Sequence, residues 1–145
     1  MRNELESWVL GRKVSVQNLS GDYDLIIGES LSQVPGPPPH YHENLHESFY
    51  IVTGEMDFII NGEQRNVKAG ESIDIPPKTL HTFVNSKSEN CKWVNIHSPK
   101  RFAEFFRKYG IPTSEENAME KSVAPEIIQE VLNTAGDYDM IIQME

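Results

Sequence analysis

The segment Gly36-Pro37-Pro38-Pro39-His40-Tyr41-His42-Glu43-Asn44-Leu45-His46-Glu47 holds three of the five histidines of this 145-residue chain. In an extended strand, side chains two residues apart point to the same face, so His40 and His42 are expected to project together. Glu47 follows a short polar turn and can return a carboxylate toward the same point. Two imidazoles and one carboxylate that converge can hold a transition metal with open positions. The segment therefore predicts a metal site, with a histidine-rich polar hairpin as the alternative.

Length and composition exclude several classes of protein. A chain of 145 residues suits one domain, and a formal net charge of −9 without a basic patch argues against a nucleic-acid partner. The single cysteine, Cys91, allows no internal disulfide and suits a reducing compartment. Residues 1–6 lack the apolar core of a signal peptide, and no apolar run is long enough to span a bilayer. We expect a cytoplasmic protein without a membrane partner.

Strand signals recur up to residue 97. Short apolar or alternating runs are separated by turn-forming residues, and Asn61-Gly62 between two such runs predicts a two-residue type I′ hairpin. Many short strands at this spacing are typical of a β-sandwich or barrel rather than a parallel sheet. The expected strands cover residues 8–10, 13–17, 23–28, 47–52, 58–60, 63–67, 72–75, 81–85 and 92–97.

Helical patterns follow only after residue 97. Ser98-Pro99 has the composition of an N-cap followed by proline at the first helical position. Four aromatic residues then follow with the spacing of one helix face, and Gly110 ends the pattern: Phe102, Phe105, Phe106 and Tyr109. We expect this aromatic stripe to pack on the barrel, although a surface for a partner or for lipid would have the same pattern. A capping-box spacing at 113–116 predicts a helical turn there. A second helix is predicted over about 125–135, and residues 137–145 could form a last short strand through 140–142.

A further ligand is expected from outside the first segment. His81 opens a strand directly after a proline corner, in a segment that we expect to lie beside the Glu47 strand when the barrel closes. Five side chains share parity with the ligands and either line a pocket or fill the barrel: Phe49, Ile51, Phe58, Ile73 and Phe83. A mostly apolar cavity around one metal suits a small-molecule substrate or ligand and offers no obvious partner to a highly anionic one.

Two spaced motifs resemble those of the cupin superfamily. His40-x-His42-x4-Glu47-x6-Gly54 is similar to the first cupin motif, and Gly70-x5-Pro76-x4-His81-x3-Asn85 is similar to the second. Fifteen residues separate the two motifs, a spacing typical of small single-domain bacterial cupins. Lys78 stands where the second motif usually has glycine, and the proline run displaces the glycine before the first histidine. Neither departure affects a ligand position.

The resemblance implies an all-β double-stranded β-helix, the cupin jelly-roll barrel, with C-terminal α-helices packed on it. Residues 1–145 would form one domain, with a barrel core over about 8–97 and a helical extension over about 98–145. Four residues would coordinate one divalent metal, for which Fe, Mn, Ni, Co and Zn are all suitable: His40, His42, Glu47 and His81. His46 points to the opposite face by strand parity, and Asn85 is interpreted as a structural residue.

The resemblance favours a metal-dependent oxidoreductase similar to quercetin 2,3-dioxygenase-like cupins, acting on a small aromatic or enol substrate. Glu47 would then be catalytic, because its carboxylate can relay the substrate's proton. One alternative is a non-catalytic metal-containing cupin that binds a small molecule. Another is an isomerase or epimerase, which the intact ligand set disfavours because sugar-nucleotide epimerases of this fold work without a metal. A homodimer is also expected, since exposed sheet edges need cover.

Overall fold

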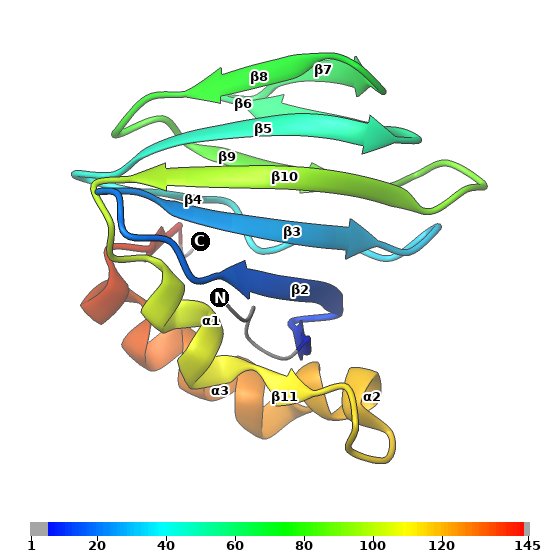
Figure 1. Cartoon of the computed structure of the whole chain (residues 1–145), viewed down its shortest axis with the longest axis vertical. Coiled ribbons are helices and arrows are strands. Elements are labelled where there is room, and N and C mark those ends of the chain that lie inside the picture. The colour runs from blue at the N-terminus through cyan, green and yellow to red at the C-terminus, as the bar shows by residue number, and fades with distance from the viewer. Residues whose placement is uncertain (1–5, 144–145) are drawn as a thin grey trace.

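The computed structural model describes residues 6–143, and residues 1–5 and 144–145, which belong to the N-terminal and final-strand predictions, lie outside the described part. Strands dominate the chain up to residue 98 (Figure 1). The strands are β1 (Ser7–Val9), β2 (Arg12–Gln17), β3 (Asp24–Ser30), β4 (His40–Tyr41), β5 (His46–Thr53), β6 (Glu55–Ile60), β7 (Glu63–Lys68), β8 (Ser72–Ile75), β9 (His81–Val84), β10 (Cys91–Ser98), β11 (Ile111–Pro112) and β12 (Ile141–Ile142).

The strands form two antiparallel sheets, in the orders β11-β1-β2-β3-β10-β5-β8 and β12-β4-β9-β6-β7. Burial alternates along β2, β3 and β10, so one face of each strand contributes to the core and the other faces outward. The hairpin between β6 and β7 has positive φ at both central residues, Asn61 and Gly62, which confirms the type I′ prediction. The arrangement confirms the expected double-stranded β-helix.

The strands that carry Glu47 and His81 belong to different sheets. β5 pairs with β10 and β8, whereas β9 pairs with β4 and β6. The prediction that the two strands lie side by side is therefore wrong. Their inward side chains meet across the interior, because a closed two-sheet barrel directs one face of every strand toward the same core.

The helices are α1 (Ala103–Tyr109), α2 (Ala118–Ser122), α3 (Pro125–Thr134) and the 3₁₀ helix η1 (Ala135–Tyr138). The predicted N-cap at Ser98 is wrong, because Ser98 still pairs with β5 as the last residue of β10. The carboxylate of Asp24 on β3 instead accepts hydrogen bonds from the backbone N–H groups of Arg101 and Ala103, at 2.7 and 3.1 Å. A distant side chain thus satisfies the start of α1. The helical turn predicted at 113–116 is displaced to α2.

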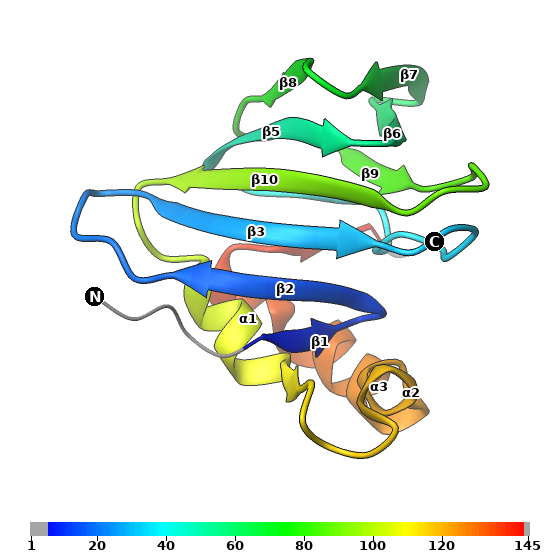
Figure 2. The same ribbon diagram turned by 45° about the vertical axis from the view of Figure 1, so that its right-hand side comes forward.

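The helical extension packs against β1 and β2 at one side of the barrel (Figure 2). Phe102, Phe105 and Tyr109 are buried, which confirms that the aromatic stripe packs inward. A short final strand is present as β12, paired with β4, but it covers only Ile141–Ile142, and the predicted residues 137–138 belong to η1 instead. Among the described residues, none of the helices combines the length and the apolar character that crossing a bilayer requires.

Candidate metal centre

The four predicted ligands lie together inside the barrel. His40 starts β4, His42 follows it directly, Glu47 lies on β5 and His81 starts β9. All four are buried, and their ligand atoms lie within 4.8 Å of one another. Nε2 of His81 lies 2.9 Å and Nε2 of His42 3.3 Å from Oε1 of Glu47. Ligands about 2.1 Å from one ion and at right angles to each other would be about 3 Å apart, so these separations suit neighbouring positions on one metal.

Each candidate histidine is oriented through its Nδ1 atom by a backbone carbonyl. The oxygens of Pro38, Asp139 and Thr79 lie 2.9, 2.7 and 2.8 Å from Nδ1 of the three rings, in the order His40, His42 and His81. Because a carbonyl oxygen only accepts, Nδ1 must carry the hydrogen and donate it. In a neutral imidazole this leaves the lone pair on Nε2, as metal ligation requires.

Three of the ligand atoms lack hydrogen-bond partners within the described part of the chain: Nε2 of His42, Nε2 of His81 and Oε1 of Glu47. They are buried and face one another. Lone pairs of two neutral imidazoles repel a carboxylate oxygen at this distance unless a cation lies between them. One divalent transition metal would satisfy all three atoms together, so the residues present fit the predicted ion.

The surroundings keep Glu47 ionised. Burial alone would raise the pKa of Glu47, but the charge of His97 and the close approach of His42 and His81 hold it well below its usual range. Burial lowers the pKa of His40 well below its usual value, assisted by the nearby His81 and His42. Burial also opposes the imidazolium of His42, but the nearby carboxylate of Glu47 outweighs it and raises the pKa of His42. A proton and a metal ion therefore compete for the same carboxylate.

His97 and Asn95 on β10 lie against Glu47, and neither was among the site residues predicted from the sequence. Nε2 of His97 lies 3.0 Å from Oε2 of Glu47, and the side-chain amide of Asn95 donates to the same oxygen at 3.0 Å. Oε2 is thus held while Oε1 points to the histidines. A sequence signal was available, because Trp93, Asn95 and His97 alternate on the inward face of the predicted strand.

A pocket beside the cluster has a volume of about 40 Å³. Of the five expected pocket residues, Phe49 and Phe83 line it. The other three, Ile51, Phe58 and Ile73, are buried in the hydrophobic core and are not among its lining residues. Aromatic residues at the start of the helical extension complete the wall: Phe102, Phe105 and Phe106. The aromatic stripe therefore helps to enclose the site as well as packing on the barrel.

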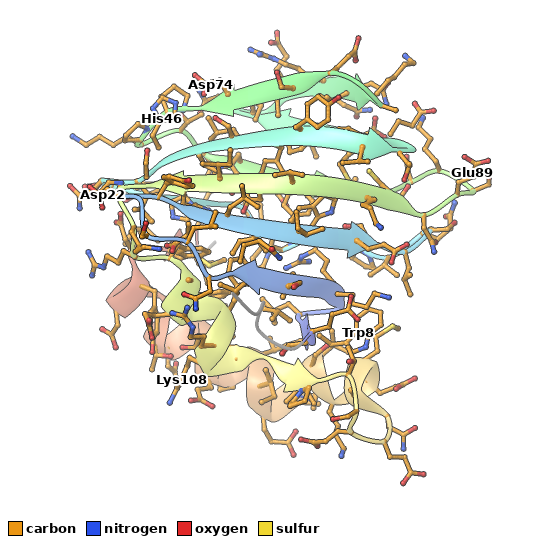
Figure 3. The ribbon with its side chains drawn as sticks, viewed as in Figure 1. Trp8, Asp22, His46, Asp74, Glu89 and Lys108 are labelled. Carbon is orange, nitrogen blue, oxygen red and sulfur yellow. The ribbon has the colours of Figure 1, made fainter. Side chains whose placement is uncertain are left out.

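His46 and Asn85 have roles outside the ligand set. Nε2 of His46 lies 2.7 Å from a carboxylate oxygen of Asp74 at the exposed edge of the barrel, where Figure 3 shows both side chains. The amide of Asn85 donates to the backbone oxygens of Ser30 and Glu89, at 3.1 and 2.8 Å. Asn85 thus connects the loop at Glu89 to the end of β3, in agreement with its structural interpretation.

Asp139 holds the first ligand segment from the far end of the chain. Its carboxylate oxygens accept hydrogen bonds from the backbone N–H groups of Glu43 and Asn44, each at 2.9 Å. Its backbone oxygen accepts a hydrogen bond from Nδ1–H of His42. Opposite His42, the N–H of Lys78 donates to the backbone oxygen of His42 at 2.6 Å. Lys78 has φ +66, so it adopts the left-handed conformation for which the second motif usually supplies glycine.

Replacing Asp139 with alanine should weaken metal binding by about 10- to 100-fold, the range typical of residues that orient a ligand. The loop at residues 43–44 loses two hydrogen bonds, and His42 loses its fixed carbonyl when the backbone relaxes. Competition with a chromogenic chelator would measure the affinity. Asp139→Asn keeps one acceptor oxygen and should have an intermediate effect. Equal affinities for all three proteins would contradict this role.

Comparisons with known proteins agree with the barrel. Residues 32–97 match the family described as "Cupin domain". Half of the chain aligns at 33% identity over 73 residues with quercetin 2,3-dioxygenase from Bacillus subtilis (strain 168), and the aligned part is 21% of that protein. The chain spans between about a fifth and about half of the curated relatives that it matches.

Solved structures share the fold at lower sequence identity. An RmlC-like cupin from Shewanella frigidimarina has a TM-score of 0.60 at 22% identity, over 69% of this chain and 86% of that one. A sugar phosphate isomerase of the cupin superfamily from Silicibacter pomeroyi has a TM-score of 0.58 at 15% identity, over 70% of this chain and 73% of its own. The matched family segment contains both motifs and all four candidate ligands, and with the double-stranded β-helix it identifies residues 32–97 as a cupin domain.

Proposed function

We propose that the protein is a metal-dependent small-molecule enzyme, a dioxygenase-like oxidoreductase that acts on a small aromatic or enol substrate. The observation that carries this proposal is the set of buried, inward-facing ligand atoms without hydrogen-bond partners in the described part of the chain. The likeness to quercetin 2,3-dioxygenase supports the reaction class. It covers a minor part of that protein, so the substrate is inferred from the site.

Four atoms would hold the ion: Nε2 of His40, His42 and His81, and Oε1 of Glu47. When bound, such an ion would supply a Lewis-acidic centre for substrate and dioxygen, which would also be redox-active for Fe, Mn, Ni or Co but not for Zn. The aromatic wall of Phe49, Phe83 and the α1 residues excludes water from the reacting groups. Metal identity is left to measurement, because three imidazoles and one carboxylate suit Fe, Mn, Ni, Co and Zn alike.

Glu47 is the proposed proton acceptor for an enol or phenol hydroxyl. Its carboxylate is ionised, as the lowered pKa indicates, and is buried beside the pocket. Nε2 of His97 and the side-chain amide of Asn95 each lie 3.0 Å from Oε2, so both neighbours position the carboxylate. The chain thus provides a positioned base for the substrate's proton.

Oxygen-electrode measurements with a panel of flavonols and other enediols would test the proposal. We expect substrate-dependent oxygen uptake by at least one of the Fe, Mn, Ni and Co forms and none by the metal-free protein. Binding without uptake by every form would favour the non-catalytic binding cupin. Anaerobic conversion of a substrate into an isomer would favour the isomerase alternative. That alternative is tested because a sugar phosphate isomerase shares the fold.

A homodimer remains a prediction, and one surface is suited to it. The outer face of β3, β10 and β5 carries adjacent apolar side chains, including Leu25, Ile27, Val94 and the exposed Tyr50 and Ile96. Self-association would cover this face. Light scattering should give the mass of two chains, and a single monomeric mass would contradict the prediction. A cytoplasmic location and the absence of nucleic-acid partners likewise remain predictions.

A further inference from the structure

Arg12 places a positive charge inside the barrel beside the candidate metal centre. It starts β2 on the same inward face as Val14 and Val16, is 7% exposed, and lines the pocket with His40 and Glu47. Its Nη1 atom is buried without a hydrogen-bond partner, and none of the described carboxylates forms an ion pair with it. This is an unusual position for an arginine, because buried charges are normally paired.

The contacts of Arg12 do not neutralise its charge. Burial lowers its pKa to about 10, so the guanidinium remains protonated at neutral pH. Its central carbon lies 5.4 Å from the centroid of the Phe83 ring, a cation–π contact that positions the guanidinium without supplying an anion. With a divalent ion bound, Arg12 and the ion together outweigh the single carboxylate of Glu47. The pocket would therefore attract an anionic ligand.

We propose that Arg12 binds the carboxylate of the small molecule that reaches the metal centre. A guanidinium offers a carboxylate two parallel N–H donors, an arrangement that neither lysine nor a neutral side chain reproduces. The inference deepens the proposed function and rests on it only in taking the metal pocket as the substrate site. It also corrects the expectation that the pocket has no partner for an anionic group.

The remainder of the ligand has a neighbouring space to occupy. The pocket at the metal, at about 40 Å³, has room for a carboxylate or hydroxyl group, so the larger body of a ligand must extend beyond it. Leu10 and Pro37 line both this pocket and a neighbouring cavity of about 530 Å³, a size usual for small-molecule sites. That cavity is lined by uncharged residues, and the amide of Gln33, its one polar side chain, is engaged by backbone oxygens. The ligand class is thus a carboxylate with an apolar body.

Anaerobic titration calorimetry on the Zn-loaded protein would test this class with three probes: 4-phenylbutyrate, its primary amide, and acetate. We expect phenylbutyrate to bind at least about tenfold more tightly than the amide, since hydrogen bonds between charged groups are the stronger ones. It should also bind more tightly than acetate, which lacks the apolar body. Equal binding of phenylbutyrate and amide, or no carboxylate binding at millimolar concentration, would overturn the role of Arg12. Acetate that binds as tightly as phenylbutyrate would overturn the proposal that the cavity holds the apolar body of the ligand.

Arg12→Met should lower the affinity for phenylbutyrate by about 10- to 100-fold and leave the affinity for the amide unchanged. Arg65→Met is the matched control, because Arg65 is exposed on β7, and it should change neither affinity. The metal content of both variants should equal that of the unsubstituted protein.

The melting temperature without ligand separates this role from a structural one. Arg12→Met removes a buried charge that has no counter-ion, so the variant should melt at the same temperature or higher. A lower melting temperature with an unchanged ratio of carboxylate to amide affinity would overturn the proposal. If the variant does not fold, the ratio in the unsubstituted protein decides alone. Absence of oxygen uptake would refute the proposed oxidation and leave these binding results standing.

Discussion

Replacing His81 with alanine should reduce the metal affinity by roughly 10²- to 10³-fold. Structural metal sites with four ligands contribute about 10–16 kcal/mol, so one ligand accounts for a few kcal/mol. The Nε2 atom of His81 lies 2.9 Å from Oε1 of Glu47, and alanine has no atom that could take its place as a ligand. Elemental analysis after dialysis against a chelator should find about one ion per chain in the unsubstituted protein and almost none in the variant.

The same substitution should remove most of the stabilisation that metal provides. A ligand at a thousand times its dissociation constant stabilises a folded protein by about 4 kcal/mol, and a 10²- to 10³-fold rise in the dissociation constant leaves only about 1.4 to 0.4 kcal/mol of this gain. The melting temperature should therefore rise on metal addition much less in His81→Ala than in the unsubstituted protein.

His46→Ala is the matched control for His81→Ala. His46 belongs to the same histidine-rich segment, but its ring is exposed and lies against Asp74. Its loss should leave metal content unchanged and cost at most about 1 kcal/mol, the usual upper value for an exposed pair. Metal retention by His81→Ala, or metal loss in His46→Ala, would show that the ligand set has been assigned wrongly.

Strand parity explains which parts of the site could be predicted from the sequence. It selected the inward-facing His40 and His42 and placed His46 outside, and the structure agrees with both. Arg12 and His97 obey the same rule, since each shares parity with buried residues of its own strand. Neither lies in a recognisable motif. Parity within the predicted strand 92–97 was sufficient to place His97, whereas the predicted strand 13–17 began one residue after Arg12.

Other features depend on contacts that no local pattern encodes. Asp139 reaches the loop after β4 across more than ninety positions of the chain, and Asp24 supplies the acceptor at the start of α1. The assignment of β5 and β9 to opposite sheets depends on the order of pairing, which alternation along a strand does not determine. Sequence patterns therefore predicted the elements and the ligands better than the contacts between distant segments.

Replacing Gly36 with alanine should destabilise the protein by at least about 3 kcal/mol, a severe loss for a domain whose total stability is about 5–15 kcal/mol. A Cβ atom added at Gly36 would lie 1.5 Å from the backbone oxygen of Phe83, less than half of a normal non-bonded separation of about 3.5 Å. The obstacle is backbone rather than a flexible side chain, so the approach to β9 must open. Urea unfolding followed by circular dichroism would measure the change.

Gly136→Ala is the matched control, because no atom lies within 4 Å of the Cβ that it would add. It should unfold like the unsubstituted protein or be more stable by up to about 1 kcal/mol, since alanine restricts the unfolded chain. Equal urea midpoints for Gly36→Ala and Gly136→Ala would show that the proline segment is not held closely against β9.

The consequence of Gly36→Ala for the metal centre follows from the segment that must move. Pro37 accepts a hydrogen bond from Thr82 on β9, and the next carbonyl, that of Pro38, orients Nδ1 of His40. Opening this approach displaces that carbonyl, so the ring of His40 loses its fixed direction while the other three ligands keep theirs. Metal affinity should therefore fall by about 10- to 100-fold in the fraction that remains folded, and Gly136→Ala should bind metal normally. Chelator competition below the urea midpoint would detect the loss. Undiminished affinity in destabilised Gly36→Ala would mean that the close approach serves the barrel alone.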